Sequence, residues 1–240
     1  ADHAGTIAPP VIRVTSSFDP RPQILESEGP VRIIDGDPLP LVGRQSQVHQ
    51  IVEHLSDSAT TGASSLIGGA QGQRTGALLD EIARHCRQRG MRDLRGTFRG
   101  TAGQPLKGFN DLLRDLVGLQ SGDSAAEQIR ETASIQLEQW LGEDAAAIAY
   151  FLDELTGESS PEKSSEQMRS FWWFKLVSAV ARELPLLITL DDYEEADPDS
   201  QKLLRGLLER CRQEEIPASY ALATDREEDQ KTGVPEGWPG

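Results

Sequence analysis

Apolar residues recur along the chain in two patterns, and the alternation of these patterns predicts the fold class. Apolar positions three and four residues apart predict helices at 45–55, 75–89, 109–117, 125–141, 144–155, 167–184 and 203–211. Short apolar runs predict strands at 65–67, 94–98, 186–190 and 219–223. Because helices separate the successive strands, we expect an α/β fold with a parallel sheet.

The first forty residues differ from the rest of the chain in their proline content. Seven prolines interrupt this stretch and bound its two strand candidates, 11–14 and 31–34. We interpret residues 1–40 as an extended proline-rich arm or linker that lies on a neighbouring surface, with a disordered tail as the alternative. Residues 41–240 are expected to form the core, with a mainly helical insertion at about 104–180.

Charge and composition exclude some classes of partner. Acidic residues number 39 against 24 Lys and Arg, so the formal charge is −15 and no nucleic-acid partner is expected. The arginines between positions 84 and 99 form a locally basic region, which is either a surface for an acidic neighbour or a solvated face. No apolar run approaches the ~18 residues of a membrane helix, so no membrane insertion is expected. Two cysteines cannot form a disulfide framework and no signal-peptide pattern is visible, so we expect a cytoplasmic location.

A glycine-rich turn between a predicted strand and a predicted helix has the order of a phosphate-binding loop. Such a loop needs glycine where the backbone approaches phosphate, a lysine that reaches the terminal phosphates, and a Ser or Thr on magnesium. In the window 68–75, Gly68 and Thr75 fit the pattern G-x-x-x-x-G-K-[ST]. Gln73 replaces its second glycine and Arg74 replaces its lysine, so an ordinary glycine-rich turn is the alternative.

Two acids, Asp191 and Asp192, directly follow the apolar run 186–190. A buried strand that delivers two carboxylates at its end suits phosphoryl transfer, because one acid orients magnesium and the other activates the attacking water. A surface turn is the alternative. We expect the glycine turn and these aspartates to end adjacent strands and to face one crevice, and we expect Glu194 and Glu195 to be exposed.

The stretch from residue 184 to residue 210 resembles a region of the STAND/AAA-like P-loop ATPase modules of large bacterial signalling proteins. It shares with them the apolar strand, the paired aspartates, the sequence Ala196-Asp197-Pro198 and the amphipathic run that follows. The resemblance continues in LPLVGR at 39–44, in 66–90, in 104–119 and in ALATDREE at 221–228. These modules are fused to nucleotide cyclases, protein kinases and LuxR-type regulators.

The resemblance implies a P-loop three-layer sandwich that binds ATP with magnesium between the glycine turn and the aspartates. The residues implied to contact phosphate are Gly68, Gly72, Arg74 and Thr75. Magnesium would be held by Thr75 and Asp191, and the catalytic position would be taken by Asp192. The terminal phosphate would be sensed by Thr224 or Arg226, and the base would be approached by Val42 and Gly43.

The sequence departs from this family in the glycine turn and after the sensor segment. Gln73 adds a side chain where the backbone passes close to phosphate, and Arg74 is broad and planar where lysine is slim. The family carries a further strand and a helical lid after the sensor segment, and because this sequence ends at Gly240 we expect both to be missing. We therefore expect weakened nucleotide binding and a larger loss of turnover.

Two hypotheses of function follow. The first is a degenerate NTPase-fold module with weak or no ATP hydrolysis. It would act as a protein-interaction or scaffold unit, with other chains or domains of a larger signalling or assembly complex as partners. The second is a working ATP-dependent switch or ATPase in which Arg74 replaces the lysine.

Overall fold

The computed structural model describes residues 12–13, 45–57, 63–68, 75–100, 105–119, 125–158 and 165–224. The strands are β1 (Ile12–Arg13), β2 (Ser64–Gly68), β3 (Arg92–Thr97), β4 (Leu186–Asp191) and β5 (Ala218–Thr224). The helices are α1 (Gln45–Asp57), α2 (Thr75–Gln88), α3 (Lys107–Leu116), α4 (Ala126–Leu141), α5 (Ala145–Thr156), α6 (Glu166–Glu183) and α7 (Pro198–Gln213), with a 3-10 helix η1 (Tyr193–Glu195). Every helix and strand expected between positions 45 and 224 is present.

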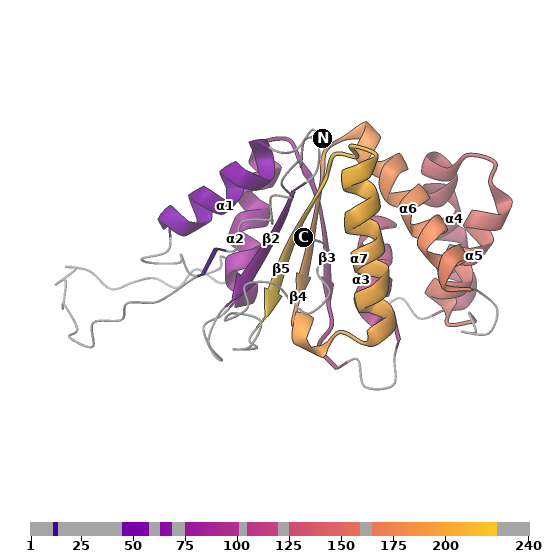
Figure 1. The fold of residues 1–240 in the computed structure, drawn as a ribbon. Helices are drawn as coiled ribbons and strands as arrows, with labels where there is room; N and C mark the ends of the chain where they lie inside the picture. The colour runs from indigo at the N-terminus through magenta and orange to yellow at the C-terminus, as the bar shows by residue number, and fades with distance from the viewer. Residues whose placement is uncertain are drawn as a thin grey trace, which may run out of the picture.

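All the strands run parallel in one sheet, in the order β1-β2-β5-β4-β3. The expectation that the glycine turn and the paired aspartates follow adjacent strands is wrong, because β5 lies between β2 and β4. The carboxyl ends of these strands nevertheless meet at one edge, where Gly68 pairs with Thr224 and Thr97 pairs with Asp191. This edge points down in Figure 1.

Helices cover both faces of the sheet, so the expected three-layer α/β sandwich is confirmed. One face is covered by α1 and α2 and the other by α3, α6 and α7, with α4 and α5 farther out (Figure 1). The side chains of β4 alternate between the two faces, as the pleat of a strand requires. Leu187 packs in the core under α1 and α2, whereas Leu186 and Ile188 pack in the larger core on the opposite face.

β3 is an edge strand, and α3 packs against it at very close range. A Cβ on Gly96 of β3 would collide with the backbone carbonyl of Gly108 in α3. A Cβ on Gly108 would in turn lie 2.5 Å from the ring of Phe98, which is fully buried. Gly96 is therefore required by the close approach of the two backbones, and Gly108 by the packing of the Phe98 ring against α3.

Two carboxylates of α3 bind outward-facing backbone groups of β3. The Asp115 carboxylate accepts the N–H of Arg95 at 3.0 Å, and the Asp111 carboxylate accepts the N–H of Thr97 at 3.4 Å. Burial raises the pKa of Asp115 above its ordinary value. α3 thus covers the edge strand and also satisfies hydrogen-bond donors that the sheet leaves open.

The segment between β3 and β4 is helical, as expected for the insertion at about 104–180, and runs from α3 to α6. Part of the proline-rich arm joins the sheet, because Ile12 and Arg13 pair with Ile67 and Gly68 of β2. The other strand candidate of the arm, 31–34, lies outside the described residues. The division into an arm and a core remains a prediction.

The basic region at 84–99 is largely neutralised by the chain's own groups. Its ion pairs are Arg84 with Glu81, Arg87 with Asp93, Arg95 with Asp80 and Asp93, and Arg99 with Asp192. The Arg92 guanidinium lies over the Trp140 ring at 5.5 Å from its centroid. Cys86 and Cys211 are free and buried. None of the helices in the described ranges has the length and apolar character needed to cross a membrane.

Candidate functional site

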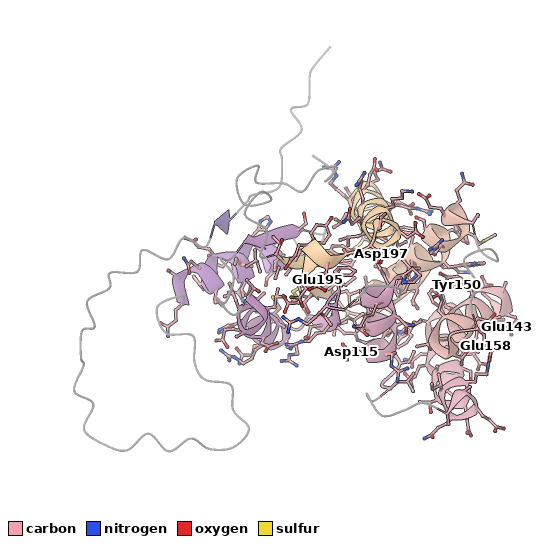
Figure 2. The ribbon with its side chains drawn as sticks, turned by 90° about the horizontal axis from the view of Figure 1, so that it is seen from below. Asp115, Glu143, Tyr150, Glu158, Glu195 and Asp197 are labelled. Carbon is pink, nitrogen blue, oxygen red and sulfur yellow. The ribbon has the colours of Figure 1, made fainter. Side chains whose placement is uncertain are left out.

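The carboxyl edge of the sheet collects the ends of four strands, seen from below in Figure 2. β2, β5, β4 and β3 end there at Gly68, Thr224, Asp191 and Thr97. Thr224 is buried, and Asp191 and Asp192 are partly exposed. The carboxyl edge of a parallel α/β sheet is the usual location of ligand sites, because loops from several strands converge there.

Asp191 faces the start of α2. A Cβ on Gly76 would lie 2.7 Å from Oδ2 of Asp191, so the carboxylate occupies space that the glycine leaves free. Thr75, the first residue of α2, adjoins Gly76. A cleft of about 330 Å³ opens at this point, with Gly76, Thr97 and Asp191 among its lining residues. The helix that follows the glycine turn therefore shares one crevice with Asp191.

The surroundings of Asp191 disfavour the charged form of its carboxyl group. Burial raises its pKa above the ordinary value, and the negative charge of Asp192 adds to the increase. The backbone N–H of Asp192, which donates to Oδ1 of Asp191 at 3.0 Å, acts in the opposite direction. A partly buried carboxylate of raised pKa that lines a cleft is a candidate functional group.

Asp192 turns toward β3 rather than toward the start of α2. Its backbone is left-handed, with φ 54°, and both of its carboxylate oxygens are engaged. Thr97 donates its hydroxyl to Oδ2 at 3.0 Å, and Arg99 donates from its guanidinium to Oδ1 at 3.1 Å. The Asp192 side chain is 13% exposed and that of Arg99 is 76% exposed. The two acids therefore have different partners and different surroundings.

The structure describes some of the residues expected at the site, and the others lie outside the described ranges. It describes Gly68, Thr75, Asp191, Asp192 and Thr224 at the carboxyl edge. The other expected residues lie outside the described residues, and they are Val42, Gly43, Gly72, Arg74 and Arg226. Glu195 is exposed, as expected, whereas Glu194 is only partly exposed, since the short helix η1 packs against the core.

Sequence reasoning missed Thr97, Arg99 and Gly76. A usable signal existed for Thr97, because polar residues that end neighbouring parallel strands must meet at the same edge. The proximity of Arg99 and Gly76 to the aspartates depends on the lateral order of the strands, which the apolar pattern does not contain.

The groups at this edge fit magnesium in the company of a nucleotide. Within the described ranges, no three His, Cys, Asp or Glu side chains are grouped so that they could hold a metal ion. Magnesium in nucleotide sites needs no such group, because one or two protein oxygens suffice when phosphates and waters supply the rest. Thr75 and Asp191 are the residues that would hold the ion. It would neutralise developing phosphate charge.

The parallel order of the sheet and the crevice between α2 and Asp191 define a P-loop NTPase-like α/β sandwich. The family model for the AAA ATPase domain matches residues 40–219, so the chain belongs to the AAA ATPase domain family. No curated protein and no solved structure matches the chain.

Replacing Gly76 with alanine is expected to change the surroundings of Asp191 while leaving the stability of the fold nearly unchanged. The added Cβ requires the Asp191 carboxylate to move, and a side-chain end can do so without disturbing the backbone. The Tm is therefore expected to stay within about 3 °C of the wild type, since alanine is also a better helix former than glycine by up to ~1 kcal/mol. The pKa of the Asp191 carboxyl group, measured by NMR during a pH titration, should differ from that of the wild type. An unchanged titration would show that Asp191 does not face Gly76.

Proposed function

We propose that this chain is a degenerate AAA ATPase-fold module that acts as a protein-interaction or scaffold unit of a larger signalling or assembly complex in the bacterial cytoplasm. Its ATP hydrolysis is weak or absent. The observation that carries the proposal is the contrast between the crevice at Asp191 and the sequence of the turn that precedes α2. Asp191 and the start of α2 share one crevice, which supports a fold inherited from a nucleotide-binding protein. The turn before α2 has Gln73 and Arg74 in place of glycine and lysine.

The substitutions in the turn before α2 are expected to lower the rate of ATP hydrolysis more than they change the fold. Phosphoryl transfer depends on positioning, and lysine offers a compact charge on a slim stem at the terminal phosphates. Arg74 can still form charge-assisted hydrogen bonds to phosphate, but its planar guanidinium has a different reach. The two described cores, on either side of the sheet, are built from apolar residues of the helices and strands.

In this proposal the site residues keep the places that the family motifs give them. Gly68, Gly72, Arg74 and Thr75 lie along the phosphates, and Thr75 and Asp191 hold magnesium. Asp192 takes the position of the catalytic acid. Thr224 or Arg226 lies at the terminal phosphate, and Val42 and Gly43 lie near the base.

The second candidate function, a working ATP-dependent switch or ATPase, is favoured by one specific observation. The raised pKa of Asp191 belongs to a carboxylate that a cation would stabilise, and the residue lies across from the start of α2. This arrangement supports a cation and phosphate site that Arg74 serves in place of lysine.

Calorimetric titration with ATP and magnesium distinguishes the two functions. The degenerate module is expected to bind with a Kd above ~1 mM, which corresponds to about −4 kcal/mol, or not at all. The wild type is compared with Arg74→Ala and Asp191→Ala, and light scattering verifies that each protein is folded and monodisperse. Sub-millimolar binding that both substitutions abolish would reject the scaffold proposal and establish the switch.

A further inference from the structure

A groove of about 320 Å³ runs between α6 and α7, which lie side by side (Figure 1). The two helices run in the same direction, since Arg169 pairs with Asp199 near their starts and Phe174 meets Arg210 farther along. Among the described residues, none that lines this groove also lines the cleft at Asp191. The groove is therefore separate from the candidate nucleotide site.

Two large apolar side chains of α6 are exposed beside this groove. Met168 is 47% exposed and Phe171 is 44% exposed, and Phe171 also lines the groove. The two residues are three positions apart, so they lie on the same side of the helix. Among the other large apolar side chains of the described residues, only Ile135 and Leu184 are comparably exposed. Neighbouring apolar side chains exposed at a groove favour contact with another molecule.

The floor of the groove follows one face of α7 and is open in its middle. The residues of α7 that line it recur at helical spacing from Asp199 to Arg210, which corresponds to about 17 Å, or three turns of a bound helix. Leu203 is buried in this floor. A Cβ on Gly206 would meet only the Ser170 hydroxyl, at 3.4 Å. The missing side chain at Gly206 thus leaves room for an apolar side chain of a ligand.

The cations that line the groove outnumber its carboxylates, and they are Arg169, Lys202 and Arg210 against Glu166 and Asp199. Nζ of Lys202 lies 3.7 Å from Glu166, and the guanidinium of Arg169 lies 3.4 Å from Asp199. Both distances exceed the roughly 2.8 Å of a strong charged hydrogen bond. The Nε–H of Arg169, whose side chain is 12% exposed, has no acceptor among the described residues. The positive charge of the groove is therefore only partly compensated, and a partner with carboxylates complements it.

Arg210 places a cation beside the exposed aromatic ring. Its guanidinium lies 3.9 Å from the centroid of the Phe174 ring and 6.0 Å from that of Phe171. Its Nε donates to the Glu214 carboxylate at 3.0 Å, which holds the side chain in this position. One bound segment can therefore place an apolar side chain on Phe171 and a carboxylate close to Arg210.

We propose that the groove between α6 and α7 binds an amphipathic helix of a partner protein, with carboxylates along both edges of the apolar face of that helix. The apolar side chains of the partner pack on Met168 and Phe171 and enter the space at Gly206, and its carboxylates face the cations of the groove. A helix laid in an apolar groove is a common mode of protein recognition. This inference rests on the proposed function and deepens it, because it names the surface and the partner of the interaction unit.

Fluorescence anisotropy of the full chain with a fluorescein-labelled synthetic peptide tests the groove. The probe has about eighteen residues, or five helical turns, with leucine at every third or fourth position and glutamate at the positions that flank the leucines. One control peptide has glutamine in place of glutamate, and another has the residues of the probe in shuffled order. Phe171→Ser, Gly206→Leu and Lys202→Ala alter the groove. Ile135→Ser is the matched control, because it removes an apolar side chain of 63% exposure from α4.

The wild type is expected to bind the probe at least about threefold more tightly than either control peptide. Phe171→Ser and Gly206→Leu are expected to weaken probe binding about fivefold or more, Lys202→Ala about twofold, and Ile135→Ser not measurably. Circular dichroism verifies that each variant is folded, and either of the first two variants suffices for the comparison. Equal affinity for the three peptides, no binding of the probe, or an equal loss in Ile135→Ser overturns the proposal. A dimer that Phe171→Ser dissociates, detected by light scattering, overturns it in favour of a second copy of the chain.

Calorimetry with ATP and magnesium tests the proposed function separately. Sub-millimolar ATP binding that Asp191→Ala abolishes, together with intact probe binding, overturns the degenerate module and not the groove. Absence of both ATP binding and probe binding overturns the groove and not the degenerate module.

Discussion

Replacing Gly96 with alanine is expected to lower the free energy of unfolding by about 3 kcal/mol, the upper part of the usual range for overpacking. The new Cβ meets the backbone carbonyl of Gly108, and it also comes within 3.0 Å of the Leu190 side chain. A backbone carbonyl cannot rotate away as a side chain can. The helix that carries it is also tied to β3 by Asp115.

Thermal and urea denaturation, followed by circular dichroism, measure this effect, and a decrease in Tm of roughly 10 °C is expected for a chain of this size. Gly206→Ala is the matched control, since a Cβ at that position in α7 meets only the Ser170 hydroxyl at 3.4 Å. The control is expected to be as stable as the wild type or more stable. Equal stability of Gly96→Ala and Gly206→Ala would show that α3 does not approach β3 as closely as described.

Replacing Asp191 with asparagine is expected to stabilise the fold at neutral pH by roughly 0.5–2 kcal/mol, the range of single stabilising substitutions. The folded-state pKa of Asp191 is raised by burial and by the charge of Asp192, so folding favours the protonated form of this group. The stabilisation from protonation is fully present below the unfolded-state pKa of about 4, and it is lost as the pH rises through the folded-state value. Asparagine retains the neutral form at every pH and can still accept the backbone N–H of Asp192.

Urea denaturation of both proteins from pH 3 to pH 8 measures the difference. The two stability curves are expected to converge at the acidic end and to separate as the pH rises, with the variant above the wild type. Where calorimetry detects a magnesium dependence of ATP affinity in the wild type, this dependence is expected to disappear in the variant, because the proposed carboxylate ligand is gone. A variant less stable than the wild type at pH 7 would contradict the description of Asp191 as a partly buried charge repelled by Asp192.

The sequence predicts the elements well because their signals are local. The spacing of Ile129, Ala133, Leu137 and Leu141 marks the buried face of α4, and these residues are indeed buried. The apolar spacing predicts a start of this helix at 203, whereas α7 begins at Pro198. Apolar spacing cannot detect its first turn, where Asp197 accepts the N–H groups of Asp199 and Ser200.

The lateral order of the strands was not predictable in the same way. Strand β5 is the last strand among the described residues, but it lies between β2 and β4. Its residues are all buried, and nothing in a run of buried residues specifies its neighbours. The error about adjacent strands follows directly from this limit.

In the candidate site, too, local features were predictable from the sequence and contacts between distant segments were not. Asp191 was predictable, because a carboxylate directly after a buried strand has to lie at the edge of the sheet. Its neighbour Gly76 was not, and neither was the bond from Arg99 to Asp192, which joins residues 93 positions apart. Contacts between distant segments depend on tertiary packing, which one sequence does not display.

The carboxylates of α3 that bind β3 also protect this side of the sheet from pairing with other polypeptide chains. Aggregation into cross-β fibrils starts when an unfolded segment pairs with free backbone groups at an open side of a sheet. On the β3 side, the donors of Arg95 and Thr97 are already bound by Asp115 and Asp111, so an incoming peptide would have to displace a packed helix. On the opposite side, β1 as far as the structure describes it pairs with Ile67 and Gly68, the last two residues of β2, and the described residues leave the start of β2 unpaired there. Fibril growth under denaturing stress is therefore expected to begin at β2.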